Sequence, residues 1–96
     1  MAANPTNHIN YSHLNTLATT VIKPAPGWLH NITFNNPAAT SVITIYDNTS
    51  GSGTVIGVIT VPASPQPVTL TYEVSFNVGL TIVMATAASD ITVSWE

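Results

Sequence analysis

The sequence predicts an all-β fold: a single-domain β-sandwich or jelly roll of about seven short antiparallel strands. Segments rich in Val, Ile, Thr and aromatic residues, which suit a pleated surface, recur along the whole chain. Clusters of Pro, Gly, Asn and Ser separate these segments at intervals of roughly 8–12 residues. No segment shows the apolar spacing of an amphipathic helix, and 96 residues suffice for one domain.

The chain is expected to begin with a polar arm, residues 1–12, followed by the sandwich domain, residues 13–96. The arm is rich in asparagine, contains Pro5 and lacks strand periodicity, so it has little apolar surface to offset the entropy of ordering. Ile9 and Tyr11 are suited to anchoring on a partner, and we expect the arm to become ordered on a neighbouring subunit. A frayed terminus without a role is the alternative.

The first strand region covers residues 13–23 and ends at the Pro-Ala-Pro-Gly turn at residues 24–27. Three later strands, at residues 28–35, 68–76 and 91–95, alternate apolar and polar residues and should each have one solvent-facing side. The same alternation places four side chains of the first of these strands on one face: Trp28, His30, Ile32 and Phe34. It also predicts a core centred on Ile32, Phe34, Leu70, Tyr72, Val74, Ile91 and Val93.

The central hairpin, residues 41–47 and 54–61 around an Asn/Thr/Ser/Gly turn, is apolar on both faces, and so is the strand at residues 80–85. If these strands share a sheet, its outer face presents Ile and Val to whatever lies beyond, and such patches usually mark a contact site. We therefore expect a symmetric homo-oligomer, with a trimer favoured. A sheet deeply covered within one chain is the competing account. The candidate partner-interface residues are Ile9, Tyr11, Ile43, Ile45, Ile56 and Val58.

Charge is scarce, because charged residues make up 5% of the chain against about 25% in an ordinary domain. Lys23 is the only lysine and there is no arginine, which excludes the phosphate contacts of nucleic-acid binding and attraction to an anionic membrane. The sequence has no cysteine, and its start lacks the basic and apolar regions of a secretory signal. We expect synthesis and folding in a cytoplasm.

The sequence offers no constellation for catalysis, a cofactor or a metal, and we expect a protein that is not an enzyme. Asp47 precedes a turn, which favours hydrogen bonds to turn amides over a calcium site. The histidines His8, His13 and His30 would have to converge to bind zinc, so packing or solvated roles are favoured. The tryptophans Trp28 and Trp95 are expected in core or interface packing rather than in a sugar-stacking platform.

Four runs carry a resemblance to a known family. They are Pro-Gly-Trp-Leu-His-Asn-Ile at residues 26–32, Thr-Ile-Tyr-Asp-Asn-Thr-Ser at 44–50, Phe-Asn-Val-Gly-Leu-Thr-Ile at 76–82 and Asp-Ile-Thr-Val at 90–93. In outline, residues 14–96 resemble the small β-sandwich virion proteins of tailed bacteriophages. The shared motifs are turn and strand signals rather than catalytic residues.

The resemblance implies a structural role as a head decoration or cement subunit, which binds the capsid shell and stabilises it. The implied partners are the major capsid protein or other virion subunits, and the implied location is the exterior of the capsid. A carbohydrate- or receptor-binding module of a phage fibre or surface protein is the alternative. An exposed aromatic platform on a monomer would favour that alternative, whereas a symmetric oligomer that binds shells would favour the decoration protein.

Overall fold

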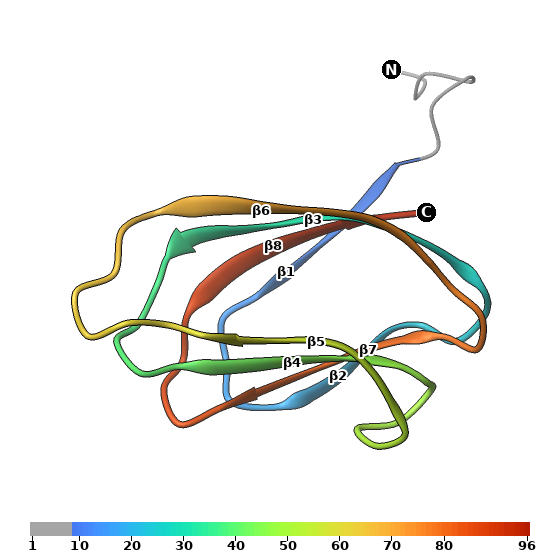
Figure 1. Ribbon diagram of the computed structural model, residues 1–96, viewed down its shortest axis with the longest axis horizontal. Coiled ribbons are helices and arrows are strands. Elements are labelled where there is room, and N and C mark those ends of the chain that lie inside the picture. Colours follow the sequence, from blue (N-terminus) through green and yellow to red (C-terminus); the bar gives the residue numbers. More distant parts are fainter. Residues whose placement is uncertain (1–8) are drawn as a thin grey trace.

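The computed structural model describes residues 9–96, which form two four-stranded antiparallel sheets packed face to face (Figure 1). The strands are β1 (Asn10–Leu14), β2 (Thr19–Lys23), β3 (Gly27–Asn36), β4 (Val42–Asp47), β5 (Thr54–Thr60), β6 (Val68–Phe76), β7 (Leu80–Ala85) and β8 (Asp90–Trp95). The first sheet has the order β1-β8-β3-β6 and the second the order β2-β7-β4-β5. The predicted all-β sandwich is confirmed. Over these residues no helix could cross a membrane.

The two kinds of strand distinguished in the sequence separate into the two sheets. The strands predicted to have one polar face correspond to β3, β6 and β8, which all lie in the first sheet. The strands that are apolar on both faces correspond to β4, β5 and β7, which share the second sheet. The hydrophobic pattern therefore assigned these strands to the two sheets correctly. A strand with one face in solvent has a polar side chain at every second position, whereas a strand covered on both faces does not.

The start of the domain differs from the prediction, since residues 9–96 contain eight strands and β1 already begins at Asn10. Residues 10–12 were expected in the arm, but β1 pairs antiparallel with β8, with Tyr11 opposite Ser94. Ser12 faces inward and accepts a hydrogen bond of 3.0 Å from the Trp95 indole nitrogen. Because a polar residue occupies this inward position, the sequence does not alternate between apolar and polar residues here, and the strand was not predicted. Residues 1–8 lie outside the described residues, so the expectation for that part of the arm stays a prediction.

The core lies between the sheets and consists of apolar side chains from both. Of the seven residues predicted to centre it, Ile32, Phe34, Ile91 and Val93 are buried, and Leu70, Tyr72 and Val74 are partly buried against them. The buried apolar set of the described chain is Leu29, Ile32, Phe34, Ile43, Ile45, Val61, Phe76, Leu80, Ile82, Met84, Ile91 and Val93. The second sheet contributes five of these, all from its two central strands, β4 and β7, and Val61 directly follows β5.

The predicted face of β3 is wrong at its start, because a β-bulge interrupts the alternation. The pairing of β3 with both neighbours shifts register between Leu29 and Asn31. As a result Leu29 is fully buried together with Ile32 and Phe34, while Trp28 is 39% exposed. A bulge inserts one residue into the ladder and so reverses the faces of the residues before it.

The turn between β6 and β7 is held by the carboxylate of Asp47. This side chain accepts hydrogen bonds from the backbone N–H groups of Asn77 and Val78 at 2.8–3.0 Å, and a longer one from Gly79. Burial acts to raise the pKa of Asp47, but the three amide hydrogen bonds outweigh it and lower that pKa. Asp47 therefore bonds turn amides as predicted, although the amides belong to a turn distant in sequence.

Truncation of Phe34 tests the assignment of the core. Phe34→Ala should lower the free energy of unfolding by about 3–5 kcal/mol, because Phe34 is buried between the sheets. Leu70→Ala should cost less, since Leu70 is only partly buried. Urea denaturation gives both values, with the exposed Thr71→Ala as a control expected within about 0.5 kcal/mol of the parent. A loss at Phe34 no larger than that of the control would contradict the assignment.

Candidate functional site

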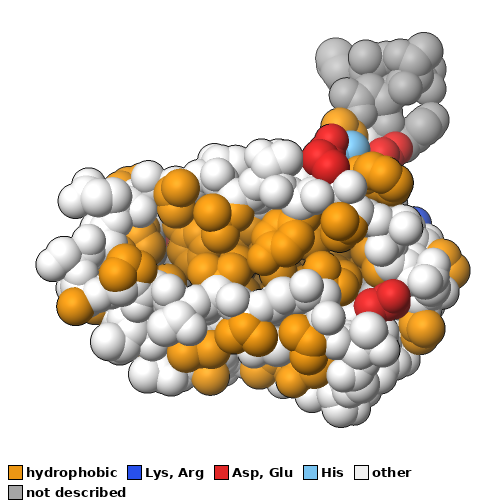
Figure 2. All heavy atoms as spheres, viewed as in Figure 1, with side chains coloured by type: hydrophobic (Ala, Val, Ile, Leu, Met, Phe, Trp, Pro, Cys, Tyr) orange, Lys and Arg blue, Asp and Glu red, His pale blue; other side chains and the backbone are white. Residues whose placement is uncertain are grey.

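The flank between β5 and β6 is an apolar surface of the described chain. Both strands are edges, since β5 pairs only with β4 and β6 only with β3. Figure 2 shows a continuous hydrophobic band running between the two sheets along this flank. The side chains of Ile59, Leu70 and Val74 are half-buried there because they face the core from strands that have no further neighbour.

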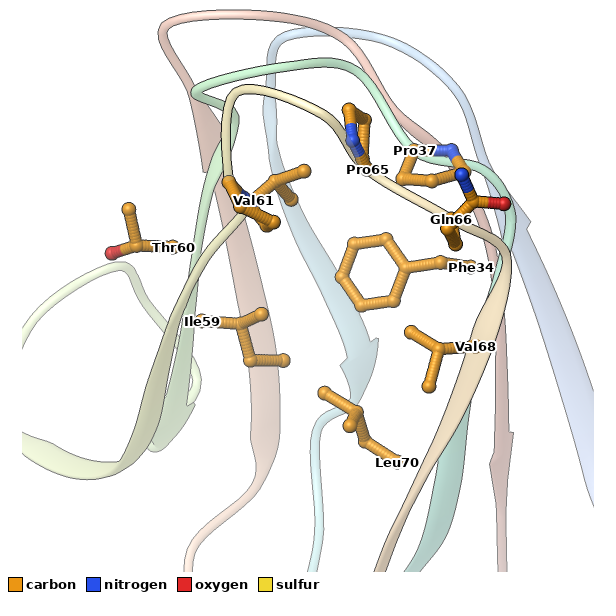
Figure 3. A pocket seen from close by; sticks show the side chains of 10 residues that line it. Phe34, Pro37, Ile59, Thr60, Val61, Pro65, Gln66, Val68 and Leu70 are labelled. Carbon is orange, nitrogen blue, oxygen red and sulfur yellow. The ribbon is translucent and has the colours of Figure 1, made fainter.

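A cleft of about 230 Å³ opens at one end of this flank (Figure 3). The ring of Phe34 lies at its centre, with Ile59 and Val61 on one side and Val68 and Leu70 on the other. The loop between β5 and β6 stands over it, and the prolines of that loop restrict its backbone. The lining residues are Phe34, Pro37, Ile59, Thr60, Val61, Pro62, Pro65, Gln66, Val68 and Leu70.

The cleft suits a neutral apolar group. No charged residue lines it. Its polar lining residues are Thr60 and Gln66, and the hydroxyl of Thr60 points away from the cleft (Figure 3). An apolar cavity of about 150 Å³ is large enough to bind benzene, so this volume admits one aromatic ring or a short aliphatic chain. Beside the cleft, the side chain of Tyr72 extends from β6 to Gly57 of β5. A Cβ atom at position 57 would lie only 2.8 Å from the tyrosine hydroxyl. Glycine at this position is what allows the tyrosine to pack over β5.

The candidate interface residues fall into two groups. Ile43 and Ile45 are fully buried and Ile56 packs against the same core, so these three belong to the interior of one chain rather than to its surface. The competing account, a sheet covered within the chain, therefore applies to the inner face of the hairpin. Tyr11, Val58 and Ile9 are 75%, 57% and 48% exposed. Their part in a partner interface stays a prediction.

The outer face of the second sheet is partly apolar and largely uncharged. Register places Val42, Thr44 and Tyr46 of β4 on this face, opposite Thr60, Val58 and Val55 of β5. The hairpin loop lies across its far end, where Gly51 approaches the side chains of Thr19 and Val83. The sequence indicated that this sheet was apolar on both faces, but only the strand order shows which strand remains an edge.

A second cluster lies where the bulged strands meet. The His30 imidazole contacts Glu73 through Nδ1 and Glu96 through Nε2, both at 2.8 Å. Ionised carboxylates only accept hydrogen bonds, so both contacts are satisfied together when both ring nitrogens carry a proton. The hydrogen bond to Glu96 raises the pKa of His30, burial opposes this, and the contact with Glu73 adds to the rise.

The same bulge determines the geometry of this cluster. Glu73 has a φ of 53°, which is uncommon for a residue other than glycine. The ring of Trp28 lies 6.4 Å from the ring of His30. His13 lies in a separate cluster and contacts Asp90 at 2.7 Å, so it does not converge with His30. His8 lies outside the described residues. Across residues 9–96, no group of three or more His, Asp or Glu side chains could hold a metal ion.

Two features of these sites were missed in the sequence. The cleft combines β3, β5, β6 and two loops, and its one local signal is the proline-rich stretch at residues 62–67. In the His30 cluster, Glu73 and Glu96 lie 43 and 66 positions from His30 in the sequence, so no local pattern predicts the cluster.

No protein-family model, no curated protein and no solved structure matches this chain.

The His30 cluster predicts a pH dependence of stability. Because the folded pKa of His30 is raised, its stabilisation should be fully present below the unfolded pKa of about 6.5 and lost as the pH rises through the folded pKa. Urea denaturation between about pH 6 and pH 9 measures this. His30→Gln should flatten the decline, and Glu73→Gln should reduce it. An identical decline in the parent and His30→Gln would contradict the assignment.

Proposed function

We propose that this chain is a non-enzymatic structural subunit of a virion, of the head decoration or cement type, which binds the exterior of the capsid shell. The observation that carries the proposal is the neutral apolar flank between β5 and β6, with its cleft, on a chain that has a single lysine. Exposed patches of this kind on small domains mark contact sites. The sequence resemblance supplies the class of assembly.

The composition supports a subunit with permanent neighbours. A surface with few charges repels its neighbours weakly, which favours association. The outer face of the first sheet is polar and its side chains bond to one another, as in the 3.0 Å contact between the hydroxyls of Thr33 and Thr69 and the 2.7 Å contact of His13 with Asp90. A homo-oligomer is part of the proposal, and its favoured number of three comes from the resemblance alone.

The proposal predicts that shell binding depends on the open flank. Purified chain should co-sediment at a fixed stoichiometry with shells assembled from the major capsid protein of its own virus. Val68→Glu adds a charge at the rim of the cleft, at a side chain that is 47% exposed, and should weaken binding at least tenfold. Val21→Glu is the matched control, because Val21 is similarly exposed but lies on the opposite edge strand of the second sheet. Failure of the parent chain to bind shells, or equal loss in both variants, would contradict the proposal.

A carbohydrate- or receptor-binding role is the second candidate, and the surroundings of Trp28 favour it. The indole is partly exposed next to His30, whose partners Glu73 and Glu96 have half-exposed carboxylates able to accept hydrogen bonds from hydroxyl groups. Trp95 does not extend this platform, because it packs against the core and its indole nitrogen donates to Ser12.

Trp28→Ala separates the two candidates. If a glycan binds the parent chain by packing on the indole, this variant should lose binding at least tenfold, since a tryptophan buries about 150–250 Å² when it is covered and a tenfold change corresponds to about 1.4 kcal/mol. Binding is measured on a glycan array and then by calorimetry. Absence of any glycan binding by the parent, or binding that Trp28→Ala leaves unchanged, would contradict the carbohydrate role.

A further inference from the structure

Four strands form the edges of the two sheets, and three of them carry features that discourage pairing with another strand. β6 has a bulge and the charged Glu73 at its positive-φ position. β2 has only five residues, a bulge near its end and the charged Lys23. β1 also has only five residues, and its His13 is paired with Asp90. Short length, charge and bulges are the usual protections of a sheet edge.

The remaining edge, β5, lacks this protection over most of its length. Its sequence is Thr-Val-Ile-Gly-Val-Ile-Thr, without charge or proline. The only register shift with β4 involves Ile56, so residues 57–60 pair regularly with β4. The ladder extends to Val61, whose backbone N–H donates to the Ser41 carbonyl at 2.8 Å. Residues 57–61 therefore form a regular, uncharged open edge, which is a template for strand pairing.

The hydrogen-bond pattern shows which groups this edge presents. In an antiparallel pair, residues alternately bond to the partner strand and point away from it. Since Val61 bonds toward β4, Ile59 and Gly57 do the same, and the backbone groups of Val58 and Thr60 point outward. The Val58 and Thr60 side chains are exposed on the outer face of the same sheet.

We propose that β5 pairs antiparallel with β5 of a second copy of this chain. The register that uses both outward-pointing residues is centred on Ile59, and it sets Val58 opposite the partner's Thr60 and Thr60 opposite the partner's Val58. Each such pair exchanges both of its backbone hydrogen bonds. The two second sheets then continue into one eight-stranded sheet, which is within the usual size of open sheets.

A second copy is favoured over another occupant because the edge is complementary to itself. An isologous contact places the same residues on both sides, so a charged residue in it would lie near an identical charge and be repelled. Along residues 57–61 there is none, and Val58 meets a threonine, a pair of β-branched residues that suits cross-strand packing. Ile59, Thr60 and Val61 also line the apolar cleft, so the partner strand would cover its rim. The contact closes at two copies, so it is an alternative to the trimer that the resemblance implies, and it does not involve Val68 of β6, where shell binding is tested.

Sedimentation equilibrium of the full chain from about 10 μM to 1 mM tests the proposal, since an edge contact of limited area gives modest affinity. The parent chain should dimerise. Val58→Lys should raise the dissociation constant at least tenfold by bringing charge to the edge, and Val58→Pro should do so by removing an outward N–H without breaking a bond to β4. Val21→Lys, the same change on the opposite edge of the sheet, should leave the dimer intact.

Disulfide trapping tests the register, because the chain has no cysteine of its own. A mixture of Val58→Cys and Thr60→Cys chains should cross-link as a heterodimer, since hydrogen-bonded pairs have Cα atoms about 5.5 Å apart, the separation that disulfides prefer. Either variant alone should cross-link far less, because its two cysteines would be diagonal neighbours about 7–8 Å apart.

A monomeric parent chain over the whole range would overturn the proposal, and so would a dimer or trimer that both Val58→Lys and Val58→Pro leave intact. Equal loss in Val58→Lys and Val21→Lys would also overturn it, and so would Val58→Cys homodimers in place of heterodimers in the mixture. Circular dichroism confirms that each variant is folded before it is scored. Failure of the parent chain to bind shells while it still dimerises would count against the proposed function only.

Discussion

The structure depends on the contact between the inner faces of two four-stranded sheets. Each sheet hides one apolar face, and burial of apolar surface at about 25 cal/mol per Å² is the main term that offsets the entropy of ordering a small chain. The central strands β3, β8, β4 and β7 supply most of the fully buried side chains. The edge strands β5 and β6 face the same core but have a neighbour on one side only, which leaves most of their inward side chains half-buried. The apolar flank and its cleft thus follow from the same contact that holds the fold together.

The bulge in β3 links the packing of the core to the polar cluster. It turns Leu29 inward and leaves His30 between β6 and β8, where Glu73 and Glu96 reach it from either side. Glu73 occupies a backbone conformation that costs energy for a residue with a side chain, and its contact with His30 helps to maintain it. The same irregularity interrupts the β6 edge. A single local departure from regular pairing therefore places a titratable group and makes β6 a poor partner for another strand.

Because charged residues are scarce, the remaining surfaces repel neighbouring molecules only weakly. The 96 residues include one lysine and four side-chain carboxylates. All four carboxylates make contacts within the chain: Asp47 bonds turn amides, Asp90 pairs with His13, and Glu73 and Glu96 both contact His30. Little charge remains to separate one molecule from its neighbours. For a freely diffusing domain such a surface favours association, whereas for a subunit with fixed neighbours it is compatible with close packing.

The sequence by itself determined the fold class, the separation of strands into two kinds and most of the core, because alternation with a period of two reports directly which side of a strand is buried. It could not reveal β1, whose inward Ser12 is polar, or the exposure of Trp28, since a bulge arises from the pairing of distant strands. Nor could it tell that Ile43 and Ile45 face the core of their own chain while Val58 faces outward. Strand order and register decide these points, as they decide the cleft, the His30 cluster and the open edge of β5, because each is assembled from residues that meet only when the two sheets pack.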